Sequence, residues 1–156
     1  MSELHELLLA CHERIRRFTG GLLALCEPPA SDERFLPTVQ ACLAYFEQAL
    51  PLHAQDEDES LLPRLMALPG PPVVALEAMG EQHRRIEALQ PRVCAALREL
   101  LAGEPLHEPE LFRTFSALLR EHIREEELRI FPRLEELSGQ EQSRMVDELR
   151  ARRRTA

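Results

Sequence analysis

The chain has 156 residues, which is the size of one domain with its own hydrophobic core. Its 27 acidic side chains outnumber the 19 basic ones and give a formal net charge of −8, which argues against nucleic acid as a partner. No apolar run approaches the ~18 residues of a membrane span, and the N-terminus carries charge where a signal peptide is apolar, so we expect a cytoplasmic protein without a membrane partner.

Five segments carry apolar residues at helical spacing, without sustained period-two alternation. Proline and glycine separate them at Pro28-Pro29, at residues 69–72, at residues 103–105 and at Ser138-Gly139. We therefore predict long helices over about residues 3–26, 32–66, 73–102 and 109–136, and a short one over about 139–152. Pro51 and Pro91 lie inside two of these helices and are expected to bend them, although Pro51 could instead restart its helix before His53.

The short links between the long helices predict antiparallel neighbours. The predicted fold class is therefore all-α, with an up-down-up-down four-helix bundle over residues 1–137 and a short C-terminal helix with a basic tail over residues 138–156. A capping box, Ser138-x-x-Glu141, predicts the start of the last helix, and the arginines of the tail are expected to oppose its dipole. This helix either caps the bundle or forms a dimer contact, which leaves a monomer or a homodimer open.

Two stretches of the chain are almost copies of each other. His53 and His122 are each followed by glutamate after four residues and by Pro-Arg-Leu after ten. A third His-x-x-x-Glu pair is His83 with Glu87, and His12 lies in the first predicted helix. Positions i and i+4 share one helix face, so an imidazole and a carboxylate at this spacing can hold one metal ion or two adjacent ones.

The alternative is that these are ordinary His–Glu pairs on a solvated helix face. Against it, the pairs lie on three helices, the remaining long helix also offers a histidine, and the longer string occurs twice. Imidazoles and carboxylates that converge in a bundle core would cost free energy without a cation. The candidate metal ligands are His12, His53, Glu57, His83, Glu87, His122 and Glu126.

The types of ligand narrow the choice of metal. Imidazole mixed with carboxylate, without thiolate, favours iron or manganese over structural zinc, although manganese or zinc can occupy such a site in a purified protein. Seven ligands are too many for one ion and suit two ions bridged by carboxylates.

On these motifs, together with Leu-Leu-Pro63 and Ile-Phe-Pro132, the chain resembles the hemerythrin-like HHE cation-binding family over about residues 8–135. The resemblance implies a non-heme di-iron centre with an oxo or hydroxo bridge inside a four-helix bundle. By position, it implies that His83, Glu87 and His122 hold one iron and that His12 and His53 hold the other, with Glu57 and Glu126 as bridges. The second iron is then one ligand short of octahedral, which leaves a place for a small diatomic or peroxide ligand.

The sequence departs from the oxygen-carrying hemerythrins, which have histidine where this chain has Glu87 and a histidine–aspartate spacing of five in their last motif. The oxygen ligand at Glu87 is expected to stabilise ferric iron and to make oxygen binding less reversible. Arg16 holds the place in the first helix that Glu87 holds in the third, so it either approaches the open position or pairs with a surface carboxylate.

The resemblance implies several functions and selects none of them. The first is the binding or sensing of oxygen, nitric oxide or iron, and the alternative is a di-iron oxidoreductase acting on peroxide or nitric oxide. A metal-free structural bundle is a third hypothesis, apart from what the resemblance implies. The four cysteines lack C-x-x-C spacing and are expected to be mostly small core thiols, with a redox role for Cys11 beside His12 as the alternative. His5 and His107 have no carboxylate at i+4 and are not assigned to the site.

Overall fold

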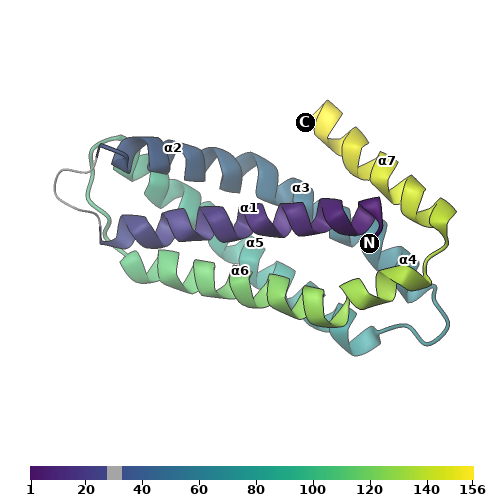
Figure 1. The fold of residues 1–156 in the computed structure, drawn as a ribbon. Coiled ribbons are helices and arrows are strands. Elements are labelled where there is room, and N and C mark those ends of the chain that lie inside the picture. Colours follow the sequence, from purple (N-terminus) through teal and green to yellow (C-terminus); the bar gives the residue numbers. More distant parts are fainter. Residues whose placement is uncertain (28–32) are drawn as a thin grey trace.

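The computed structural model describes residues 1–27 and 33–156, and every regular element in these ranges is helical (Figure 1). The predicted break at Pro28-Pro29 and the predicted start of the second helix at residue 32 lie outside the described residues. The elements are α1 (Glu3–Cys26), α2 (Phe35–Ala44), η1 (Tyr45–Ala49), α3 (Leu50–Gln55), η2 (Asp56–Leu61), α4 (Leu62–Met66), α5 (Val73–Leu101), α6 (Pro109–Arg129), η3 (Phe131–Glu136) and α7 (Gly139–Thr155).

Four antiparallel rods form the body of the molecule: α1, the run from α2 to α4, α5 and α6 (Figure 1). α1 packs on α2 and α6, and α5 packs on the same two elements, so the rods enclose a common core. This arrangement confirms the predicted all-α bundle with a short C-terminal helix. None of the helices in the described ranges combines the length and the apolarity that a bilayer crossing requires.

The second rod is not one regular α-helix. Two π turns, η1 and η2, interrupt it, and each ends two residues before a proline, Pro51 and Pro63. Proline has no N–H and its ring crowds the carbonyl four residues earlier, so the ladder cannot continue unchanged. In η2 the N–H of Leu62 donates to the carbonyl of Glu57, five residues back. The prediction of a single helix here was therefore too simple, and α3 restarts just before His53.

A glycine and a proline mark the ends of two other long helices. α5 runs unbroken through Pro91 and closes with a Schellman motif, in which Gly103 has a φ of 86° and the N–H of Glu104 donates to the carbonyl of Glu99. α6 ends at Arg129, before the predicted boundary at residue 136. The remaining residues form the 3₁₀ helix η3, which has Pro132 in its first turn.

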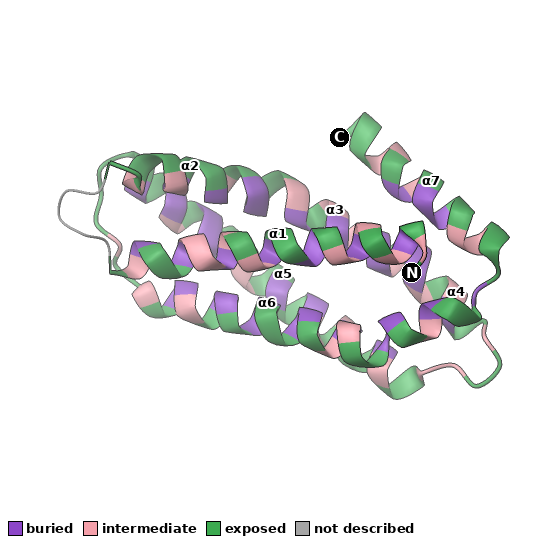
Figure 2. Cartoon of the chain, viewed as in Figure 1, coloured by how far each residue is buried: buried purple, intermediate pink, exposed green. Residues whose placement is uncertain are grey.

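The buried residues lie mainly on the sides of the helices that face one another (Figure 2), and they form two apolar clusters with a polar layer between them. One cluster contains Phe46, Val93 and Phe115, and the other, nearer the N-terminus, contains Leu8 and Phe131. The layer between them consists of His12, His53, Glu57, His83, His122 and Glu126, none more than 5% exposed. Burying so many polar groups is costly unless they have partners, so this layer is the candidate site.

The C-terminal helix α7 packs on α1 and η2. Its predicted N-cap is present, since the Ser138 hydroxyl accepts from the N–H of Glu141 at 3.1 Å. Arg152 and Arg153 contact the buried carboxylate of Asp56 at 2.9 and 2.7 Å. We expected these arginines to oppose the helix dipole of α7. They therefore also attach α7 to the bundle.

Candidate metal centre

Six of the seven predicted ligands converge in the polar layer, and all four rods contribute. The ligand atoms form two groups, and within each group they all lie within 4.8 Å of one another. The groups are His12, His53, Glu57, Glu126 and Glu57, His83, His122, Glu126. Because Glu57 and Glu126 belong to both, the layer is a pair of adjacent ligand sets with two carboxylates in common.

The apolar spacing of each helix explains why the imidazoles point inward. His12 lies four residues after Leu8 and three before Ile15, so it continues the buried stripe of α1, and His83 holds the equivalent place in α5. His53 and Glu57 lie on either side of the junction between α3 and the π turn η2. A π turn of this kind redirects side chains and is frequent at functional sites.

Carboxylate oxygens and imidazole Nε2 atoms approach one another closely inside the layer. The closest distances are 2.5 Å for Glu57 to His53, 2.7 Å for Glu57 to His83, 3.1 Å for Glu126 to His12 and 3.3 Å for Glu126 to His122. Nevertheless, His53 Nε2 and one oxygen of each glutamate are buried without a hydrogen bond of acceptable geometry. Buried polar atoms are rarely left in this state, and a shared cation would satisfy them. The residues present therefore fit a metal ion.

The same contacts shift the pKa values of the buried groups. Burial would raise the pKa of Glu57, but the surrounding imidazoles hold it well below its usual range. Burial and the charge of Glu57 raise the pKa of Glu126 to about 7. Burial would lower the pKa of His83, but its two carboxylate partners raise it to about 10, whereas burial dominates at His122 and lowers its pKa. Without metal, some side chains of the layer therefore carry protons. They must release these protons before they can bind a metal ion.

Three imidazoles have outer partners that our sequence reasoning missed. The Nδ1–H groups donate from His12 to Glu127 at 2.9 Å, from His83 to Asp58 at 2.8 Å and from His122 to Gln82 at 2.9 Å. Metal-binding histidines are usually oriented by such a partner, which also raises their basicity. The Nε2 atoms are therefore held toward the interior before any metal binds.

The sequence did contain a signal for these partners. Asp58 follows Glu57, Gln82 precedes His83, and Glu127 follows Glu126, so each partner is the direct neighbour of a ligand. One residue is a rotation of about 100° around a helix, so the neighbour of an inward ligand points into the groove beside the next helix.

Arg16 pairs with a carboxylate rather than approaching the ligand sets. Its guanidinium lies 2.8 Å from both oxygens of Glu127 and 2.6 Å from Glu13. Because Glu127 accepts the Nδ1–H of His12, Arg16 acts on the site only through that carboxylate.

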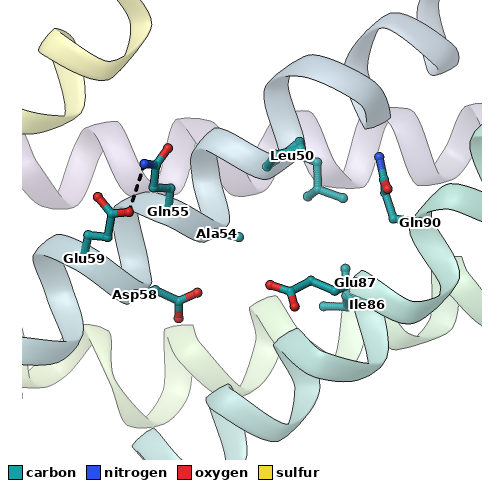
Figure 3. Close-up of a pocket in the computed structure, with 9 residues that line it drawn as sticks. Leu50, Ala54, Gln55, Asp58, Glu59, Ile86, Glu87 and Gln90 are labelled. Carbon is teal, nitrogen blue, oxygen red and sulfur yellow. Dashed lines mark hydrogen bonds between the residues drawn. The ribbon is translucent and has the colours of Figure 1, made fainter.

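Glu87 is the one predicted ligand outside both groups. Its side chain is exposed on α5, where it lines a surface cavity of about 430 Å³, and Figure 3 shows its carboxylate extending toward that of Asp58. Glu87 also lines a small inner cavity of about 20 Å³ beside Glu57 and His83. It therefore stands between the surface and the buried layer, and its role as a ligand stays a prediction.

The cysteines are free thiols and three of them are buried. Burial raises the pKa of Cys42 to about 11, as expected for a core residue. Burial would also raise the pKa of Cys11, but His53 and Arg14 beside it lower it.

His5 stays outside the ligand groups and packs edge-on against Phe131, with ring centroids 5.5 Å apart.

The fold and the site together define a four-helix-bundle protein with a buried layer of histidines and carboxylates able to hold metal. The family model for the hemerythrin HHE cation binding domain matches residues 3–134, and the chain belongs to this family. The chain is also similar to an uncharacterized protein of Haemophilus influenzae, with 28% identity over 102 residues. That match covers 64% of this chain and 59% of the length of the Haemophilus protein. The resemblance inferred from the sequence motifs is confirmed at the level of the family.

Proposed function

We propose that this protein binds two iron ions and uses them to bind or sense oxygen, nitric oxide or iron itself. In this proposal His12 and His53 would hold one iron and His83 and His122 would hold the other, while Glu57 and Glu126 would serve both. Glu87 completes the second set by turning inward from the surface cavity. The observation that carries the proposal is that two adjacent ligand groups have both glutamates in common.

Iron bound there would supply one-electron exchange with oxygen species and nitric oxide. The protein orients the imidazoles through Glu127, Asp58 and Gln82 and keeps bulk water out with the apolar clusters. Phe131 contributes directly, because its ring stacks on that of His12 with centroids 4.8 Å apart.

The size of the inner cavity supports a small ligand. A cavity of about 20 Å³ among these side chains has room for no more than about one water-sized molecule, so any exogenous ligand bound beside the metal would have to be small. Every polar residue that lines it belongs to the proposed ligand set, and the others are Leu50, Ala54, Ile86 and Leu119. Turnover of peroxide needs a proton donor and acceptor besides the ligands, so this lining favours binding over catalysis.

A second candidate, an oxidoreductase acting on peroxide or nitric oxide, is favoured by the position of Glu87. If Glu87 stays free of the metal, its carboxylate links the surface cavity to the inner one and can carry protons between them. The two functions therefore differ in what this single side chain does.

Iron loading tests the proposal. After anaerobic incubation with ferrous iron and desalting, we expect about two irons per chain in the wild-type protein, and a large loss of both in Glu57→Gln because Glu57 serves both groups. Glu135→Gln, the same change at an exposed position of η3, is the control and is expected to load normally. A wild-type protein that retains no iron contradicts the proposal. With hydrogen peroxide, one round of iron oxidation supports binding or sensing, whereas steady oxygen release supports the oxidoreductase.

A further inference from the structure

The π turn η2 carries both a shared ligand and an outer partner of the proposed metal centre. Glu57 is one of the two glutamates that belong to both ligand groups. The next residue, Asp58, accepts the Nδ1–H of His83 at 2.8 Å. A small displacement of η2 would therefore move a ligand of both metal sites and the carboxylate that orients a third side chain.

The composition of η2 makes its conformation costly. Four consecutive acidic residues, 56–59, lie in its first turn. Asp56 and Glu57 are both buried, so water screens the repulsion between their carboxylates only weakly. The imidazoles of His53 and His83 lie against Glu57 on the inner side of the turn. A π turn is also a rare conformation, so we expect it to need further support from outside the ligand layer.

The C-terminal helix α7 supplies this support at Asp56. Arg152 Nη1 lies 2.9 Å from one carboxylate oxygen of Asp56, and Arg153 Nη2 lies 2.7 Å from the other. Asp56 belongs to neither ligand group. Its charge is therefore balanced by two guanidinium groups of α7 and not by the groups that would bind metal.

Arg152 contacts both ends of the acidic turn. Besides its contact with Asp56, its Nη2 donates to the hydroxyl of Ser60 at 2.6 Å. One guanidinium thus joins two residues that lie on either side of Glu57 and Asp58. The Arg152 side chain is only 15% exposed, so these contacts are better protected from solvent than an ordinary surface ion pair.

We propose that Arg152 is a positioning residue for the metal centre, because it holds η2 in the conformation that directs Glu57 and Asp58 toward the ligand layer. The inference rests on the proposed function, since it concerns the metal that Glu57 would bind. Arginine suits this role because its planar guanidinium offers donors at a fixed spacing to two acceptors. α7 begins at Gly139, after the last residue matched by the family model, 134, so this contact comes from outside the matched domain.

Amide hydrogen exchange of the metal-free protein tests whether Arg152 holds η2. The N–H of Leu62 donates to the carbonyl of Glu57, so its exchange reports on the π turn directly. We expect Arg152→Gln to speed this exchange roughly tenfold, the effect of losing a charge-assisted contact, and to leave Val93 of α5 unchanged. Arg154→Gln makes the same change at an exposed position of α7 and is expected to exchange as the wild type does.

Ferrous iron affinity, measured by anaerobic competition with a chelator, tests whether η2 positions the ligands. Because Glu57 serves both ligand groups, we expect Arg152→Gln to weaken both binding steps by roughly tenfold. Arg154→Gln is expected to weaken neither. Leu97→Ala controls for a general loss of stability, because it empties space in the apolar cluster far along α5 from His83. We expect it to lower the free energy of unfolding and to bind iron as the wild type does.

The outcomes separate this inference from the proposed function. Unchanged exchange of Leu62 in Arg152→Gln would overturn the inference whether or not metal binds. Faster exchange with wild-type iron affinity, or equal weakening in Leu97→Ala, would also overturn it, because α7 would then stabilise the fold without positioning ligands. Weakening of a single binding step would exclude a route through Glu57. If the wild-type protein binds no iron, the proposed function fails and the positioning role falls with it.

Discussion

Glu127→Gln is expected to weaken one iron site and leave the other intact. Glu127 accepts the Nδ1–H of His12 at 2.9 Å and contacts no other imidazole of the layer, and His12 belongs to only one of the two ligand groups. Glutamine keeps an acceptor at this position but removes the negative charge that raises the basicity of the imidazole.

The structure sets the size of the effect. Removing such an outer partner weakens metal binding by roughly 10- to 100-fold, equivalent to about 1.4 to 2.7 kcal/mol. The Glu127 side chain is 25% exposed and its charge is shared with Arg16, which holds both of its oxygens. We therefore expect the lower limit, a loss of roughly tenfold or about 1.4 kcal/mol.

The assay is anaerobic competition for ferrous iron between the protein and a chromogenic chelator, which resolves the two binding steps. Glu121→Gln is the control, because Glu121 lies on the same helix, is 51% exposed and, among the described residues, pairs with Arg124 alone. Equal weakening of both steps, or no weakening of either, would refute the assignment of His12 to a single iron.

Three further predictions concern the surroundings of the site. Asp56→Asn is expected to lower the free energy of unfolding of the metal-free protein by roughly 2 to 3 kcal/mol, because it breaks a buried carboxylate contact to two arginines that are only 15% and 34% exposed. Urea unfolding measures this, and Asp147→Asn on the exposed face of α7 is expected to change it by no more than about 0.5 kcal/mol. Arg64 of α4 holds the pKa of the Glu148 carboxyl of α7 below its ordinary value of 4.5. The contact between them therefore stabilises the fold at pH values above 4.5, and this stabilisation is lost as the pH falls through the lowered pKa. NMR signals of α7 in the metal-free protein are therefore expected to move toward random-coil positions in acid before those of the bundle. Glu87→Gln is expected to weaken only the iron held by His83 and His122 in the chelator assay.

Each of these predictions has a result that contradicts it. Equal loss of stability in Asp56→Asn and Asp147→Asn would mean that the buried contact does not hold α7. Simultaneous loss of α7 and bundle signals in acid would mean that the two unfold as one unit. Wild-type iron affinity in Glu87→Gln would remove Glu87 from the ligand set and strengthen the case for a proton-carrying role.

The fold and the metal-binding layer were accessible from the chain alone because both depend on short-range periodicity. A His-x-x-x-Glu pair shares a helix face whatever surrounds it, and a histidine in step with the apolar stripe, such as His12, must turn inward when that stripe is buried. Proline and glycine marked the ends of the elements for equally local reasons. Repetition of the motif on separate helices then indicated a common site and the family.

Tertiary structure alone decided which side chains meet across the grooves between helices. The pairing of Glu127 with His12, the attachment of α7 to Asp56 and the exposure of Glu87 depend on how each rod is rotated and shifted against its neighbours. Those rotations follow from the packing of the whole core and from the π turns before Pro51 and Pro63, and local spacing does not encode them.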